Sequence, residues 1–299
     1  MKIAISGGTG MVGRKFSNLL LSQGHEVIVL TRNKSHQANG IQFVQWLKDD
    51  AKPELYLEDL DAFVNLAGTP LNEGRWTKKQ KLKIYNSRIQ TTDEIIRIFH
   101  ALQNKPHVFL NASAVGIYPV SESAIYTEQT TEKAQDFLGT VVQDWENHAQ
   151  YAQQLGIRTC FCRFGVILAK DEGALPLMVL PYKLGIGGKI GSGKQWVSWI
   201  HVDDVAKALL FVIEQKQLNG PINFTTPNVN RMKDFCKTIG AVLHRPYWIH
   251  IPSTTLKIVL GEKSKLILEG QQVFPEKLVN AGFEFQYASL NDALRNLYA

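Results

Sequence analysis

The sequence predicts an α/β fold: a doubly wound parallel sheet followed by a smaller C-terminal α+β cap. Strands and helices alternate through the first half, as in parallel sheets whose faces are covered by helices. After Gly165 the regular alternation of strands and helices ends, because glycine and proline become frequent and the expected elements become short. We therefore expect a sheet domain over residues 1–167, to which 199–226 returns, and a cap over 168–299.

The elements of the first half follow from apolar runs and from their spacing. Short apolar runs predict strands over 2–6, 26–31, 42–46, 62–66, 107–112 and 158–164. Apolar residues at helical spacing predict helices over 11–23, roughly 77–103 and roughly 133–155.

The second half is expected to hold shorter elements. A helix near 174–184 follows a loop, and a helix over 203–215 is expected to be capped by Asp203 or Asp204. A strand near 221–225 comes next. The tail predicts short helices over 231–243, 254–260, 275–281 and 289–297.

The turn Gly7-x-x-Gly10-x-x-Gly13 joins the first strand to the first helix. Free backbone N–H groups and the positive end of the helix attract a pyrophosphate there, and side chains would block its approach. This is the strand–turn–helix–strand context of Rossmann-type folds, so the turn predicts a dinucleotide site. The alternative is that the glycines only permit close packing.

The end of the second strand indicates which dinucleotide is bound. NAD sites usually place a carboxylate on the ribose hydroxyls here, but no acidic residue occurs in 31–35. Arg32 suits the 2′-phosphate of NADP, so we expect NADP as the cofactor. The alternative for Arg32 is a solvated loop residue.

Composition limits the remaining possibilities. The 299 residues are 44% hydrophobic, with no apolar run long enough for a membrane span, and we expect no signal peptide because the first residues read as a core strand. Three cysteines without zinc spacing fit a reducing compartment, so we expect a cytoplasmic protein without a metal. The net charge of +6 is scattered apart from a lysine cluster at 78–83, which we interpret as a solvated helix face and not as a nucleic-acid site.

These motifs occur in the order found in the extended short-chain dehydrogenase/reductases. The chain resembles their NAD-dependent epimerase/dehydratase superfamily in its glycine turn and in Asn65-Leu66-Ala67-Gly68, Ser113-Ala114-Val115-Gly116, Arg163-Phe164-Gly165 and Trp199–Ala206. It is most similar to an atypical branch, the "epimerase family proteins", which shares Ser87-Arg88-Ile89 and Trp145-Glu146. The expected cofactor-binding residues are Gly7, Thr9, Gly10, Met11, Val12, Gly13, Thr31, Arg32, Leu66, Ala67, Gly68, Arg88, Ser113 and Phe164.

The catalytic Tyr-x-x-x-Lys pair of these enzymes is missing. No tyrosine has a lysine four residues on, and with Glu146 as the usual following acid the two places fall on Leu138 and Val142. Neither side chain can carry a proton or hold a ribose. The resemblance therefore implies the cofactor site but not the catalytic pair, a loss that the atypical branch shares.

Three other residues are candidates for the missing chemistry: Ser113, Tyr118 and Glu128. Ser113 would place a hydroxyl near the nicotinamide, or it could be a turn residue. Tyr118 is the first candidate for acid or base, its alternative being an aromatic wall of the pocket. Glu128 could bind a substrate hydroxyl or serve as a helix-cap partner. For Glu146 we expect a structural role, and for His201 a place in the core.

Two functions remain open. The first is an NADP(H)-dependent oxidoreductase or epimerase-like enzyme acting on a small hydroxylated or nucleotide-linked substrate. The alternative is an NADP(H)-binding sensor or regulator with little or no catalysis, which the missing Tyr and Lys favour. We expect a small-molecule substrate as partner, with neither nucleic acid nor membrane, and the resemblance allows a homodimer through the helices near 77–103 and 133–155.

Overall fold

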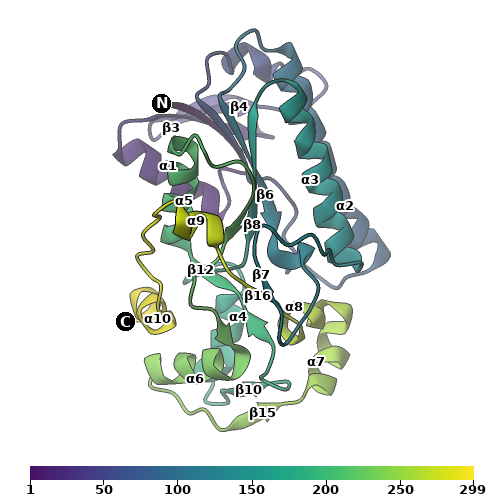
Figure 1. Cartoon of the computed structure of the whole chain (residues 1–299), viewed down its shortest axis with the longest axis vertical. Helices are drawn as coiled ribbons and strands as arrows, with labels where there is room; N and C mark the ends of the chain where they lie inside the picture. The colour runs from purple at the N-terminus through teal and green to yellow at the C-terminus, as the bar shows by residue number, and fades with distance from the viewer.

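The computed structural model describes all 299 residues and is built around one eight-stranded sheet. The strand order is β13-β8-β6-β5-β1-β2-β4-β3, and every neighbouring pair is parallel except β3 (His36–Ala38) with β4 (Figure 1). The parallel strands are β1 (Lys2–Ser6), β2 (Glu26–Thr31), β4 (Ile41–Gln45), β5 (Ala62–Asn65), β6 (Val108–Ala114), β8 (Arg158–Phe164) and β13 (Gly220–Phe224). The predicted doubly wound parallel sheet is thereby confirmed.

Helices cover both faces of this sheet (Figure 1). One face carries α1 (Met11–Ser22) and α5 (Val202–Glu214), and the other carries α2 (Lys78–Ala101) and α3 (Phe137–Gln154). Because side chains alternate along a strand, β1 contributes to both layers. Ile3 and Ile5 pack with the α1–α5 layer, whereas Ala4 packs with the α2–α3 layer.

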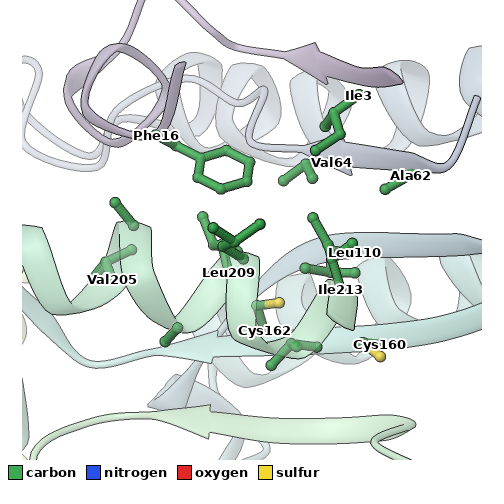
Figure 2. Close-up of a cluster of buried hydrophobic side chains, with 14 of the residues drawn as sticks. Ile3, Phe16, Ala62, Val64, Leu110, Cys160, Cys162, Val205, Leu209 and Ile213 are labelled. Atoms are coloured by element: carbon green, nitrogen blue, oxygen red, sulfur yellow. The ribbon is translucent and has the colours of Figure 1, made fainter. Parts of the chain in front are cut away.

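Figure 2 shows the α1–α5 layer in detail. The ring of Phe16 on α1 points toward Val64 on β5, and Leu209 on α5 lies across from it. Cys160 and Cys162, two residues apart on β8, both belong to this cluster, because side chains two residues apart on a strand share a face. Strands buried on both faces read as continuous apolar runs, which is why their positions could be found from the sequence.

The rest of the chain forms a smaller C-terminal region with its own core of 16 buried residues, among them Tyr182, Trp199 and Phe235. The boundary between residues 167 and 168 stays a prediction.

The further helices of the whole chain are α4 (Leu175–Lys183), α6 (Met232–Val242), α7 (Ser253–Leu260), α8 (Lys265–Leu268), α9 (Glu276–Asn280) and α10 (Leu290–Tyr298). Single turns of 3₁₀-helix are η1 (Pro53–Tyr56), η2 (Val115–Ile117) and η3 (Gly261–Ser264). The short strands are β7 (Ile125–Tyr126), β9 (Val166–Leu168), β10 (Gly188–Ile190), β11 (Trp196–Val197), β12 (Trp199–His201), β14 (Asn230–Arg231), β15 (Ile249–Ile251) and β16 (Gln272–Val273).

One expected detail is wrong: neither Asp203 nor Asp204 caps α5. The cap is His201, whose Nδ1 accepts a hydrogen bond from the backbone N–H of Asp203 at 3.1 Å. The Asp204 carboxylate is occupied elsewhere, because it accepts from the backbone N–H groups of Gln286 and Tyr287 at 2.9 Å each. None of the helices combines the length and the apolar character that a membrane span requires.

Candidate functional site

The glycine turn between β1 and α1 is shaped by close backbone contacts. Gly7 has a φ of +73°, and a Cβ there would lie 2.6 Å from the carbonyl of Leu66. A Cβ at Gly13 would lie 2.5 Å from the carbonyl oxygen of Gly7. Both positions therefore require glycine, and the turn is pressed against the end of β5.

The turn leaves the amino end of α1 without a side-chain cap. Gly10 precedes the helix, and the first turn contains no acidic residue. The first N–H groups of a helix have no partner within it, and the helix dipole adds positive potential there. This end of α1 can therefore accept an anion such as a pyrophosphate.

The strand order reverses beside β1, since β2 lies on one side of it and β5 on the other. In open α/β sheets ligands bind in the crevice at such a point, outside the carboxyl ends of the strands. A buried amide network fixes these ends: Ser6 Oγ donates to Asn65 Oδ1 at 2.6 Å, and Asn65 Nδ2 donates to Asn111 Oδ1 at 2.7 Å. Sequence reasoning did not identify Ser6 or Asn111, although each polar residue interrupts or ends an apolar strand.

The residues expected to bind the cofactor come to this one edge of the sheet. The turn 7–13 follows β1, Thr31 ends β2 and Arg32 follows it, and 66–68 follow β5. Phe164 is the last residue of β8. Arg32 is exposed and has no ion pair or hydrogen bond within the protein, so its guanidinium is available to a ligand. Their roles as cofactor ligands stay predictions.

Ser113 is at the edge but faces inward. It is 2% exposed, and its Oγ donates to Oε1 of Glu146 on α3 at 2.6 Å. Arg163 on β8 holds the same carboxylate with two hydrogen bonds of 2.8 Å. Glu146 is thus held by Ser113 and Arg163 inside the protein, which agrees with the structural role expected for it.

Tyr118 joins this network from the other side. It is 1% exposed, its ring stacks on Tyr126, and its hydroxyl accepts from Arg163 Nη1 at 2.8 Å. The hydroxyl also lies 2.9 Å from Asn223 Oδ1, to which it can donate. Burial raises the pKa of Tyr118, and the charge of Arg163 offsets part of that rise.

Glu128 extends the network toward the tail. Its Oε1 accepts from the backbone N–H of Asn223 at 2.9 Å and of Lys277 at 3.4 Å, and its Oε2 has no partner. Burial raises the pKa of this carboxyl group. The three catalytic candidates therefore lie in one buried network, and none presents an exposed side chain at the sheet edge. Their catalytic roles stay predictions.

Apart from the glycine turn and the two arginines at positions 32 and 88, three segments at this edge are apolar. They are 66–69, 114–116 and 164–167, and among their exposed and half-buried residues Thr69 carries the only hydroxyl and no side chain titrates. Arg88 reaches the same edge from α2. No cluster of three or more His, Cys, Asp or Glu side chains is placed to hold a metal ion.

The fold and this edge define a Rossmann-type protein of the short-chain dehydrogenase/reductase class. The chain belongs to the NAD dependent epimerase/dehydratase family, whose model matches residues 3–224. Residues 251–297 match a second model, described as a domain of unknown function, DUF1731.

Close relatives span the whole chain. The Bacillus subtilis epimerase family protein YfhF is 44% identical over 300 residues, covering 100% of this chain and 98% of the relative. Among solved structures, a human epimerase family protein crystallised with NADPH is 31% identical, with a TM-score of 0.89 and 99% of each chain covered. A Corynebacterium glutamicum nucleoside-diphosphate sugar epimerase is 29% identical with a TM-score of 0.80, covering 99% of this chain and 58% of that one. The resemblance described under "Sequence analysis" is thereby confirmed.

Proposed function

We propose that this protein is an NADP(H)-dependent oxidoreductase or epimerase-like enzyme acting on a small hydroxylated or nucleotide-linked substrate. The observation that carries the proposal is the glycine turn, pressed against the end of β5 and leaving the amino end of α1 uncapped. The human relative with NADPH supports it, because that protein shares the fold over 99% of both chains.

Different residues of this edge would contact different parts of such a cofactor. The backbone N–H groups in the first turn of α1, which follows Gly10, would hold the pyrophosphate, and Arg32 would hold the 2′-phosphate. The small side chain of Ala67, just after the end of β5, leaves room for the cofactor over the sheet. When bound, the nicotinamide donates or accepts a hydride, and the protein supplies binding, orientation and electrostatics.

Titration with NADPH and NADH tests this proposal. Wild-type protein should bind NADPH more tightly than NADH, and Arg32→Asp should weaken NADPH binding by about tenfold to a hundredfold, since hydrogen bonds to charged groups contribute about 1.5–3 kcal/mol. Binding of NADH should change much less. Equal loss for both dinucleotides, or binding of neither by the wild type, would contradict the proposal.

A second candidate is an NADP(H)-binding sensor or regulator with little turnover. The burial of Ser113, Tyr118 and Glu128 favours it, because none of these side chains can meet a ligand without rearrangement. Hydride transfer separates the two candidates. A sensor should bind NADPH yet leave it unoxidised with every compound of a panel of ketones, aldehydes and quinones, whereas sustained oxidation would eliminate the sensor.

A further inference from the structure

Arg88 is held in a defined place at the sheet edge. Its side chain crosses Gly68, where a Cβ would come within 3.4 Å of the guanidinium carbon. Arg88 Nη1 donates to the carbonyl oxygens of Thr69 at 3.2 Å and Ile84 at 2.9 Å. The guanidinium lies 5.1 Å from the centre of the Trp145 ring. The absence of a side chain at Gly68 leaves room for this arginine beside the end of β5.

This arginine is a half-buried cation without a carboxylate partner. The buried Arg163 pairs with Glu146, and Arg97 on the same helix pairs with Glu94, but no acidic group contacts Arg88. Its Nε and Nη2 make no hydrogen bond within the protein, and neither is among the fully buried polar atoms. Burial lowers the pKa of Arg88 to about 10, so it stays charged at neutral pH. A partly desolvated cation with free donors favours an anionic ligand.

The position along the cofactor indicates which anion this is. Arg32 follows β2, whereas Arg88 lies at the end of β5, and these strands flank β1 on opposite sides. The end of α1 between them accounts for the pyrophosphate. Arg88 therefore lies toward the nicotinamide end, where the reacting carbon of a substrate would sit.

We propose that Arg88 binds the substrate oxygen and stabilises the negative charge that develops on it, in place of the missing Tyr and Lys. This inference rests on the proposed oxidoreductase function. In reduction, bound NADPH would supply the hydride that forms the new C–H bond at the carbonyl carbon, and the C=O π electrons would move to the oxygen. The resulting alkoxide is stabilised by the free N–H groups of Arg88, and water then gives the proton, leaving an alcohol, hydroxide and NADP⁺.

The three apolar segments beside Arg88 support this route, because they offer the substrate oxygen no titratable side chain. Only Thr69 carries a hydroxyl among the accessible residues of 66–69, 114–116 and 164–167. The substrate class is thus a carbonyl compound, or the corresponding alcohol, whose oxygen faces a fixed cation.

Acetate can serve as an oxyanion probe, so the test needs no substrate. NADP⁺-saturated protein is titrated with sodium acetate at constant ionic strength against sodium chloride, and tryptophan fluorescence is followed. Trp145 is the expected reporter, and Trp145→Phe should remove the signal. Saturable binding is expected in the wild type, and Arg88→Gln should raise the acetate midpoint by about tenfold or more. The acetate midpoint of Arg88→Lys should lie between those of the wild type and of Arg88→Gln.

The matched control is Arg97→Gln, which removes an arginine of the same helix outside the site and should leave the midpoint unchanged. Affinity for NADP⁺ should stay within about threefold in Arg97→Gln. An unchanged acetate midpoint in Arg88→Gln overturns the proposal, as does a tenfold loss of NADP⁺ affinity, which would assign Arg88 to the cofactor alone. If Arg88→Gln does not fold, the ¹⁵N resonance of Arg88 Nε in the wild type must shift with acetate. If NADP⁺ does not bind at all, the oxidoreductase proposal fails, and the titration of the free protein still tests the oxyanion site.

Discussion

Glu146 and Arg163 form the buried ion pair at the centre of the polar network. Their side chains are only 9% and 6% exposed, and two hydrogen bonds of 2.8 Å join them. Such a pair contributes little net stability compared with apolar residues, but removing one partner leaves an uncompensated buried charge. At the scale of single residues, removing one member of this pair should therefore destabilise the fold strongly.

Arg163→Met should destabilise the fold by about 3–5 kcal/mol, because it leaves the Glu146 carboxylate without its cation. The double variant Arg163→Met, Glu146→Leu should regain part of this loss. Urea denaturation measures both. Lys83→Ala, which breaks an exposed ion pair with Glu73, is the control and should leave the midpoint nearly unchanged. A single variant no less stable than the double one would contradict the interpretation.

His201 gives the fold a pH dependence. Burial lowers its pKa from 6.5 to about 4, so the folded state keeps this ring neutral while the unfolded state protonates it below pH 6.5. The stability that this difference provides is fully present above pH 6.5 and is lost as pH falls toward 4, by up to about 3 kcal/mol. His201→Asn keeps a capping side chain and should flatten the loss between pH 6.5 and 4 in urea titrations. An equally steep loss in this variant would assign the effect to other groups.

At the scale of elements, the glycines before and after α1 allow the cost of a steric clash to be separated from the cost of an unfavourable backbone conformation. Gly7 and Gly24 both have positive φ, of 73° and 76°, but a Cβ at Gly24 would meet nothing within 4 Å. Gly24→Ala therefore incurs only conformational strain, about 1–2 kcal/mol. Gly7→Ala adds the clash with the Leu66 carbonyl, so it should be less stable in urea and should lose NADPH binding. Equal effects of the two substitutions would contradict this.

The sequence predicts the elements of this sheet well because their signals are local. Most of the seven parallel strands are apolar runs, and their observed ends lie close to the predicted ones. The cap of α5 was missed because histidine is not among the preferred N-cap residues, while two aspartates, Asp203 and Asp204, stand two and three residues after it.

The polar network could not be predicted, because it depends on register between distant segments. Ser113 lies beside Arg163, and Asn65 beside Asn111, only once β6 has paired with β8 and with β5. The sequence shows these residues as isolated polar positions in apolar strands. The sequence placed the candidate residues at the carboxyl ends of the strands, but it could not show that Ser113 and Tyr118 face inward.

At the scale of the whole molecule, the tail is part of the main fold. Strand β16 pairs with β7, and Gln271 Nε2 donates to the carbonyl oxygen of Tyr118 at 2.9 Å. Asn223 on β13 donates to the carbonyl oxygen of Phe274 at 3.0 Å. The segment matched by the DUF1731 model thus completes hydrogen bonds of the sheet domain.

The two regions should therefore unfold together. Urea transitions followed by tryptophan fluorescence and by far-ultraviolet circular dichroism should coincide, because loss of the tail leaves buried polar groups of β13 and of Tyr118 without partners. A chain ending at residue 250 should be markedly less stable than the full chain. Two separate transitions, or a stable shortened chain, would show that the regions are independent.

The pairing of β13 with β8 also has a consequence for biosynthesis. Ribosomes make the chain from its amino end, and 55 residues separate the last residue of β8, Phe164, from the first of β13, Gly220. Until β13 has emerged, the nascent protein displays the bare backbone of β8, a template on which other chains can aggregate. Chaperone engagement should consequently peak for ribosome-bound intermediates in this interval and decline once Phe224 has left the exit tunnel.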